Sequence, residues 1–275
     1  MSSVATTPGA DDRARRGRSG LPQVLRSEWT KLWSLRSTGW SLLAMLATTV
    51  GFAALLGWGT ADNADQIPAA ERAIFDATAI SLAGLAFGQL AAAVLGVMII
   101  SSEYSTGAIR STLVAVPRRL RLLAAKALVL LTVVLAAGTV TSFVAFLVGQ
   151  ALLAPAGLDT SLDQPGVLRA VLGGGLYLTA SALFGLALGT LLRQTAGSIV
   201  AAVAGLLVVP PLTMLLPGDW GQVVTKWFTS NAGQQITAVQ PSGDVASPWA
   251  GYLAFCLWGL VILVVAMVVM RRRDA

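Results

Sequence analysis

The chain has 275 residues, of which 55% are hydrophobic and only 12% are charged, and its net charge is +6. Soluble domains carry about 25% charged residues, so the composition excludes an ordinary soluble domain and indicates a helical protein that crosses a membrane several times. The absence of histidine and the single cysteine, Cys256, exclude an intrachain disulfide, a Cys/His metal site and histidine-dependent nucleophilic catalysis. The basic residues flank apolar segments and do not line one polar face, so we expect no nucleic-acid partner.

Residues 1–20 are small and polar and contain several arginines, which predicts a disordered, basic cytoplasmic tail. Residues 39–275 are predicted to form one transmembrane domain. A span needs about 20 apolar residues, and six segments satisfy this requirement. The predicted spans are about 40–58, 79–100, 127–153, 168–192, 196–216 and 249–270.

Between the tail and the first span, residues 21–38 have helical periodicity, with an apolar arc opposite a polar and basic one. Trp29 and Trp33 together with flanking bases predict an interfacial amphipathic helix that lies on the inner leaflet. Glu28 breaks the pattern because it falls within the apolar arc. Two interpretations stay open: a local pair with Lys31, and a pair with a base of the loop that follows the second span.

The distribution of charge predicts the topology. An arrangement with six spans and both termini cytoplasmic puts 16 of the 19 lysines and arginines on the inner side. The cytoplasmic loop 101–126 then contains one acidic and five basic residues, whereas the loop 217–248 lies outside. Within that outer loop, residues 222–239 are compatible with a short re-entrant or interfacial helix and with a plain surface loop. The sequence therefore predicts an all-α membrane protein with an interfacial helix before six spans.

Polar chemistry inside the spans is sparse. Gln89 is the one strongly polar residue placed well inside a predicted span, which lowers the expectation of an ion-coupled carrier. Pro210 and Pro211 are expected to kink or end the fifth helix, with a hinge role as the alternative. No lysine follows a glycine, so the nucleotide-binding pattern Gly-x-x-x-x-Gly-Lys-Ser/Thr is absent. We expect no catalytic, cofactor-binding or metal-binding residue, and energy for uphill transport would have to enter from another protein.

Three stretches resemble permease subunits of type-two ATP-binding-cassette (ABC-2) exporters, especially their actinobacterial branch. The first is Ser-Glu-Trp-Thr-Lys-Leu at 27–32, followed by Leu-Arg-Ser-Thr at 35–38. The second is Glu-Tyr-Ser-Thr-Gly-Ala-Ile-Arg-Ser-Thr-Leu at 103–113, followed by Pro-Arg-Arg at 117–119. The third is Ser-Asn-Ala-Gly-Gln-Gln-Ile at 230–236. Their order and depth match the six-span plan of that family.

The resemblance implies that the loop between the second and third spans docks on a separate ATPase subunit and that the interfacial helix approaches the same partner. It assigns the ATPase-coupling loop to Glu103, Tyr104, Gly107, Ile109, Arg110, Leu113, Pro117, Arg118 and Arg119. It assigns the interfacial contact to Glu28, Trp29, Lys31 and Trp33. Arg121 and Lys126 are interpreted as anchors of the positive-inside topology.

These features predict a plasma-membrane permease subunit that exports a hydrophobic or amphipathic substrate by alternating access. The expected partners are the ATPase, which would bind ATP and Mg, a second permease chain (identical or not) and the lipid bilayer. A scaffold or sensor partner that does not transport is the first alternative, because it would share this topology. An ion-coupled carrier is the second.

Overall fold

The computed structural model describes residues 21–72, 74–105, 119–240 and 245–273. Within these ranges the chain is helical and contains no strand. The longer helices are α2 (Leu21–Ser34), α3 (Arg36–Asp62), α6 (Leu85–Ser105), α8 (Arg119–Leu153), α9 (Val167–Leu192) and α14 (Pro248–Arg273). The shorter ones are η1 (Ala64–Gln66), α4 (Ala69–Arg72), α5 (Ala77–Leu82), η2 (Ala154–Ala156), α10 (Thr195–Val203), η3 (Ala204–Val208), α11 (Val209–Thr213), α12 (Gly218–Trp227), α13 (Thr229–Gly233) and η4 (Gln234–Thr237).

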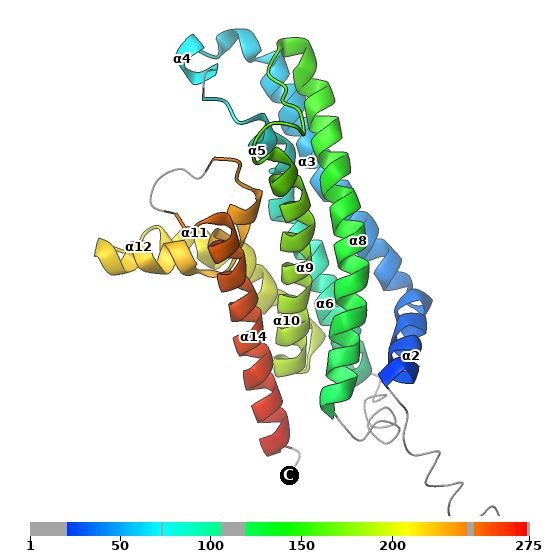
Figure 1. Ribbon diagram of the computed structural model, residues 1–275. Helices are drawn as coiled ribbons and strands as arrows, with labels where there is room; N and C mark the ends of the chain where they lie inside the picture. Colours follow the sequence, from blue (N-terminus) through cyan, green and yellow to red (C-terminus); the bar gives the residue numbers. More distant parts are fainter. Residues whose placement is uncertain (1–20, 73, 106–118, 241–244, 274–275) are drawn as a thin grey trace, which may run out of the picture.

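Six helical segments of the described chain are long and apolar enough to cross a membrane, which confirms the predicted all-α fold with six spans. They are Arg36–Asp62, Ala77–Tyr104, Arg121–Ala156, Val167–Leu192, Thr195–Thr213 and Pro248–Val269. Helix α2 and the C-terminal end of α14 lie at one end of the bundle, which we call the α2 end, and α4 lies at the other, the α4 end (Figure 1). Which end faces the cytoplasm stays a prediction.

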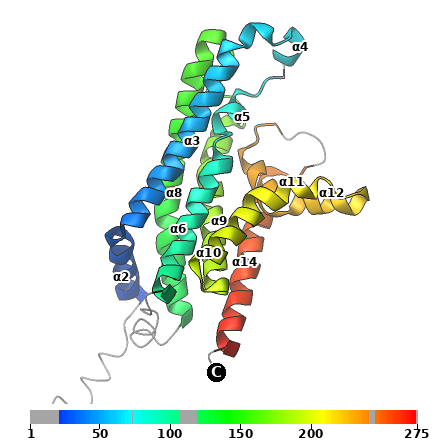
Figure 2. The ribbon, with the colours of Figure 1, turned by 180° about the vertical axis from the view of Figure 1, so that it is seen from behind.

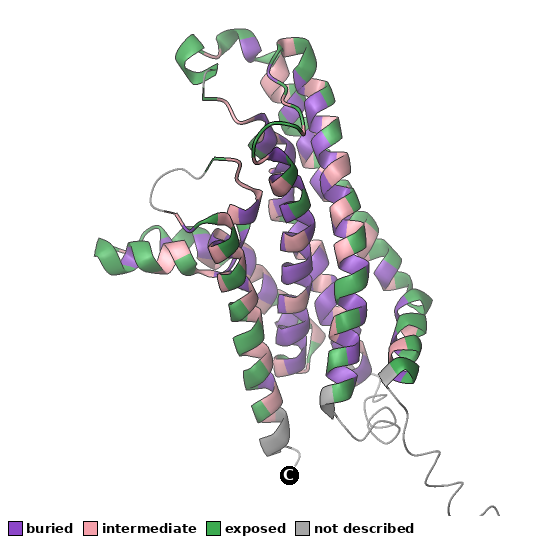
Figure 3. Cartoon of the chain, in the orientation of Figure 1, coloured by how far each residue is buried: buried purple, intermediate pink, exposed green. Residues whose placement is uncertain are grey.

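Helix α9 forms the centre of the bundle. In its apolar segment 83% of the residues are buried, whereas α14 buries only 11% and presents most of its surface outward (Figure 3). Glycines allow the close approach of α6 to α9. A Cβ atom on Gly185 would lie 2.0 Å from the carbonyl oxygen of Ala93, and one on Gly96 would lie 1.9 Å from that of Ala182. Small residues at a helix contact bring the two backbones together, as expected for packing within a membrane.

Helix α2 ends where Leu35 adopts an extended conformation, and α3 starts at the next residue. Val24 and Leu32 are buried on the face of α2 that packs against the bundle, while Trp29 and Trp33 are 43% and 55% exposed. The α2 helix lies beside α8 at the α2 end of the bundle (Figure 2). This arrangement leaves both tryptophans available for the membrane interface or for a partner.

The fifth span is not a continuous α-helix. Between α10 and α11 the chain forms a π-helical segment, Ala204–Val208, just before Pro210 and Pro211. Proline has no amide hydrogen and interrupts the helical hydrogen-bond pattern, and π-helical segments widen a helix locally. The predicted irregularity of this span is therefore present as a break in the middle of the membrane segment, not as a simple kink at its end.

The predicted outer loop is mostly helical. Helix α12 projects sideways from the bundle near its mid-height, and α13 with η4 lead back toward α9 and α14 (Figures 1 and 2). The indole nitrogen of Trp258 donates a hydrogen bond to the Trp227 carbonyl at 2.9 Å. Trp258 lies ten residues, about 15 Å, along α14 from Pro248. The end of α12 thus lies alongside the span and not beyond it.

Candidate functional site

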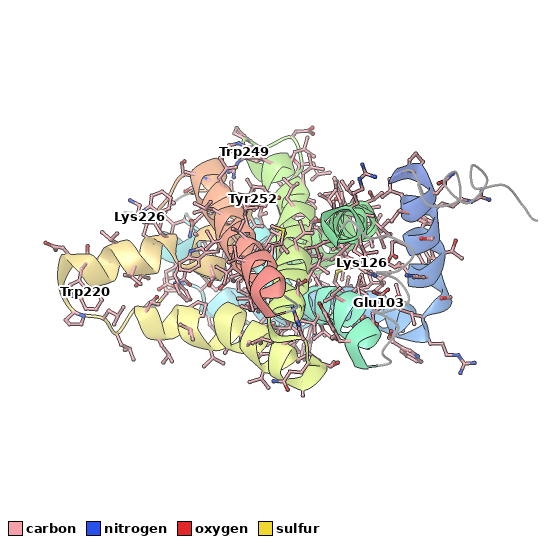
Figure 4. The ribbon with its side chains drawn as sticks, turned by 90° about the horizontal axis from the view of Figure 1, so that it is seen from below. Glu103, Lys126, Trp220, Lys226, Trp249 and Tyr252 are labelled. Carbon is pink, nitrogen blue, oxygen red and sulfur yellow. The ribbon has the colours of Figure 1, made fainter. Side chains whose placement is uncertain are left out.

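Four charged side chains from three helices meet at the α2 end. Lys126 on α8 is only 2% exposed, and its ammonium donates hydrogen bonds to Glu28 Oε2 on α2 at 2.6 Å and to Glu103 Oε1 on α6 at 2.7 Å. Glu103 and Lys126 lie together between α6, α8 and α2 (Figure 4). Lys31 on α2 completes the group, which we call the ion-pair cluster: Glu28, Lys31, Glu103 and Lys126.

Lys31 bridges the two carboxylates from the more open side. Its ammonium donates to Glu28 Oε1 at 2.8 Å and to Glu103 Oε1 at 3.1 Å, and its side chain is 44% exposed. Partial burial lowers the pKa of Lys31, but the hydrogen bonds and charges of Glu28 and Glu103 outweigh this effect, so its pKa is raised above the ordinary lysine value. The cluster contains two acids and two bases and is therefore neutral, which makes its burial tolerable.

Both interpretations of Glu28 are realised, because it contacts Lys31 within α2 and Lys126, a base of the predicted loop 101–126 that lies on α8. Its place in the apolar arc of α2 follows from this contact: the face of α2 that packs on α8 carries the carboxylate that meets Lys126. Lys126, interpreted from sequence as a topological anchor, is instead at the centre of the cluster. Breaking a buried pair by removing one partner leaves an uncompensated charge and strongly destabilises a fold.

The end of α6 is also held from the opposite side. Thr195 Oγ1 donates a hydrogen bond to Ser101 Oγ at 3.0 Å, and the Arg193 guanidinium lies over the Tyr104 ring at 5.7 Å. Arg193 caps α9 in the left-handed conformation, with φ 57°. The last turns of α6 are thus connected to α2, α8 and the α9–α10 turn. The second carboxylate oxygen of Glu103 is buried and has no hydrogen-bond partner within the described chain.

The predicted ATPase-coupling residues fall partly outside the described residues. Glu103 and Tyr104 belong to α6, and Arg119 starts α8, which begins eight residues before the predicted third span. The ends of α6 and α8 shorten the predicted loop 101–126 to the connection 106–118. Within that connection, outside the described residues, lie Gly107, Ile109, Arg110, Leu113, Pro117 and Arg118. Trp29 and Trp33 pack edge to face on α2, with ring centroids 6.1 Å apart.

A second polar group lies deep in the bundle around Gln89 on α6. The Tyr177 hydroxyl on α9 donates to Gln89 Oε1 and accepts a hydrogen bond from Gln234 Nε2 at 3.2 Å. Gln89 Nε2 donates to the backbone carbonyl of Ala86 at 3.0 Å. Gln89 and Tyr177 are fully buried. This chain of hydrogen bonds connects the third stretch of the resemblance to the second turn of α6.

The same stretch compensates the break in the fifth span. Pro210 offers no amide hydrogen to the carbonyls one turn before it. Ser230 Oγ donates to the Leu206 carbonyl at 2.8 Å, and Thr229 Oγ1 donates to the Gly205 carbonyl at 2.7 Å. Asn231 Nδ2 donates to the Pro210 carbonyl at 3.1 Å. A polar segment from outside the fifth span therefore satisfies the backbone groups that its π-helix and prolines leave open.

Sequence reasoning missed three residues that form hydrogen bonds or ion pairs inside the bundle. Tyr177 looked like one more apolar position, and Lys126 like one more inner-side base. Gln150 on α8 lay near the end of the predicted third span and received no role, yet its amide donates to Ser81 Oγ at 2.9 Å and to the Ala77 carbonyl at 3.2 Å. A usable signal existed at Pro210, since a proline inside a span implies that side chains elsewhere satisfy the interrupted carbonyls.

Two cavities lie among the described residues. One of about 560 Å³ lies among the chain before α5, the turn before α9 and residues after η4, and Asp76 and Asp159 contribute to its wall. The other, of about 440 Å³, lies beneath α12 and includes Lys226 and the amides of Asn231, Gln234 and Gln235 in its lining. Gln234 connects this second cavity to Tyr177 and Gln89.

Comparison with known proteins gives one family. The sequence model described as "ABC-2 family transporter protein" matches residues 24–209, which include most of α2, the first four spans, α10 and the π-helical segment. Two of the three stretches of the resemblance lie wholly within this match, and the third, at 230–236, lies beyond it. A search of curated proteins finds no match.

Proposed function

Because the chain belongs to the ABC-2 transporter family, we propose that it is the membrane-spanning subunit of an exporter driven by a separate ATPase. The family implies an ATPase partner in a transporter complex. In this proposal the ATPase binds ATP and Mg, and the present chain supplies the translocation path and the surface on which the ATPase acts. The narrower resemblance to the actinobacterial branch stays part of the proposal.

The observation that carries the proposal is the attachment of α6 at both ends. Its last turns contact α2 and α8 through the ion-pair cluster, next to the connection 106–118. Fourteen residues earlier, about 21 Å along the helix, Gln89 contacts Tyr177 in the polar group deep in the bundle. A partner that moved the 106–118 connection would therefore displace a helix whose other half is bonded to α9 and, through Gln234, to the second cavity.

In the proposed mechanism, the helices that these contacts connect alternate between two arrangements. The ATPase dimer closes on ATP, the connection and α2 move with it, and α6 shifts against α9 and the broken fifth span. A π-helical segment beside two prolines is a suitable hinge, because the carbonyls of Gly205 and Leu206 accept hydrogen bonds from side chains of a neighbouring segment. The substrate is hydrophobic or amphipathic in this proposal, since the spans are apolar and the polar groups inside them are few.

A second permease chain completes the proposed assembly. Helices α3 and α14 bury only 22% and 11% of their apolar segments within one chain. Each thus offers an outward apolar face to lipid or to another copy. The α2 end faces the cytoplasm of a plasma membrane in this proposal, supported by the basic residues that the sequence concentrates at that end.

The test is co-purification from native membranes in detergent or nanodiscs, followed by measurement of ATP hydrolysis in the retained material. Wild type is compared with Arg110→Glu/Arg118→Glu, which reverses two charges in the connection. The matched control, Arg271→Glu/Arg272→Glu, reverses two charges at the C-terminal end of α14. We expect wild type and the control to retain a nucleotide-hydrolysing protein and the connection variant to lose it. Equal retention by all three, or by none, contradicts the proposal.

A further inference from the structure

We propose that the cavity of about 560 Å³ beside α5 binds an organic cation that carries a protonated amine on an apolar body. This cavity, which we call the α5 cavity, has no role in the transport proposal, and binding to it is measured on the chain alone. It lies where the connection between α4 and α5 meets the connection between α8 and α9 and the chain that follows η4. Its wall residues Asp76, Thr78 and Asp159 carry the argument.

Hydrogen bonds hold the three walls of the α5 cavity in place. Gln150 on α8 is 8% exposed, and its amide nitrogen donates to the Ala77 carbonyl at 3.2 Å while its amide oxygen accepts a hydrogen bond from the Thr160 backbone at 2.7 Å. This one side chain thus connects two walls. Arg169 on α9 fixes the third, because its guanidinium donates to backbone carbonyls of the chain after η4. Walls held in this way form the cavity before a ligand arrives, as is usual for small-molecule sites.

The charge of the walls favours a cation. The described lining residues include two acids, Asp76 and Asp159, and no base. One carboxylate oxygen of Asp76 accepts a hydrogen bond from the backbone of α5 at 3.0 Å, and the other has no donor among the described residues. The connections 62–76 and 154–166 together contain six acids and one base, Arg72. An acidic surface of this kind raises the local concentration of cations and steers them toward the cavity.

A buried hydroxyl without a partner indicates a ligand that donates hydrogen bonds. Thr78 on α5 is 1% exposed and belongs to the wall of the α5 cavity, yet its hydroxyl makes no hydrogen bond with another described residue. On the same helix the buried Ser81 hydroxyl donates to the Ala77 carbonyl at 3.0 Å. Buried polar groups nearly always have a partner, and an unpaired one costs free energy. The Thr78 hydroxyl can accept a hydrogen bond from an ammonium group that also contacts a carboxylate.

The rest of the lining favours an organic cation over a metal ion. Phe75, Leu158 and Val239 contribute apolar side chains to the walls, and an aromatic ring such as that of Phe75 also attracts a cation to its face. Within the described chain, no group of three or more acidic, histidine or cysteine side chains is arranged to hold a metal ion. A volume of about 560 Å³ lies in the range of small-molecule sites and far exceeds that of a bare ion.

The probe is dansylcadaverine, in which a five-carbon chain joins a fluorescent dansyl group to a primary amine. Its N-acetyl derivative keeps the apolar body but has no charge, and its trimethylammonium derivative keeps the charge but has no N–H donor. Each compound is titrated against the purified full chain in nanodiscs, and dansyl emission is corrected with empty nanodiscs. We expect the amine to bind about tenfold or more tightly than the acetyl derivative, because charge-assisted hydrogen bonds are lost, and the trimethylammonium compound to lie between them.

Asp76→Asn and Asp159→Asn each remove one charge and should weaken binding of the amine by about tenfold to a hundredfold, without changing that of the acetyl derivative. Asparagine can still cap α5, and Asp159 is exposed, so both variants should fold. Thr78→Val should weaken the amine by about twofold to tenfold without lowering the melting temperature, because the hydroxyl has no partner in the described chain. Asp163→Asn is the matched control, since it removes an exposed acid that is not a wall residue.

Thermal unfolding without ligand shows whether each variant is folded. Equal binding of the amine and its acetyl derivative overturns the assignment. Unchanged affinity in both wall-aspartate variants, or equal weakening by Asp163→Asn, overturns it as well. A failure of ATPase co-purification would leave these binding results as they are, so this proposal and the transport proposal fail separately.

Discussion

Removal of the Lys126 charge should destabilise the fold more than any other single charge removal at the α2 end. In Lys126→Met the carboxylates of Glu28 and Glu103 lose contacts of 2.6 and 2.7 Å while both groups stay largely buried. Lys31 is then their remaining cationic partner, and its side chain is 44% exposed. Loss of one partner from a buried pair costs about 3–5 kcal/mol, and the expected loss lies in this range.

The assay is denaturant-induced unfolding in mixed micelles, followed by far-UV circular dichroism. The matched control is Arg121→Met, an exposed base on the same helix, which should change the free energy of unfolding by less than about 0.5 kcal/mol. Addition of Glu103→Gln to Lys126→Met removes one of the two carboxylates that then share Lys31 and should recover at least half of the loss. If Lys126→Met matches the control, or if Glu103→Gln makes the variant worse, the electrostatic account of the cluster is wrong.

Three further predictions concern single positions. Tyr177→Phe removes the hydroxyl between Gln89 and Gln234 and should cost about 1–3 kcal/mol in the same unfolding assay, because the fully buried Gln89 amide loses a partner. An unchanged unfolding curve would show that Gln89 finds another partner. Gly185→Ala places a Cβ atom 2.0 Å from the Ala93 carbonyl oxygen and should lower the free energy of unfolding by about 1–3 kcal/mol. In the control Gly259→Ala the added Cβ atom meets nothing closer than 3.9 Å. Equal effects of the two substitutions would contradict the close contact of α6 and α9. Because the pKa of Lys31 is raised on folding, its contribution to stability is complete below the unfolded pKa of 10.5 and is lost as the pH rises through the folded pKa. Arginine stays charged at these pH values, so Lys31→Arg should lose less stability than wild type in strongly alkaline buffer. Parallel losses of stability in the two proteins would refute the raised pKa.

The architecture was predictable because it depends on apolar length. Six spans need six long apolar segments, and every one is visible in the sequence. Helix ends were less predictable: α8 starts at Arg119 because Leu122 and Ala125 pack against Val24 of α2, a tertiary contact that hydropathy does not report. The helical character of the outer loop likewise depends on contacts with the broken fifth span and α14.

The candidate site was predictable where a residue broke its local pattern. Glu28 stood out as an acid on an apolar face, and this irregularity pointed to a partner. Lys126 did not stand out, because a base at the inner end of a span is expected on topological grounds alone. Tyr177 was hidden for a related reason: a tyrosine in an apolar helix is recognisable as a hydrogen-bonding residue only once Gln89 and Gln234 are placed around it. Pairings between distant segments need the fold.

The most direct test of the account is site-specific photocrosslinking in native membranes from two tryptophan positions of similar exposure. Trp33 on α2 is 55% exposed and Trp220 on α12 is 58% exposed, and each is replaced in turn by a photoreactive amino acid. The account predicts that the Trp33 position crosslinks to a protein that contains Gly-x-x-x-x-Gly-Lys-Ser/Thr and hydrolyses ATP, and that the Trp220 position does not. Crosslinking of such a protein from Trp220 alone, or from neither position, would contradict the claim that an ATPase docks at the α2 end.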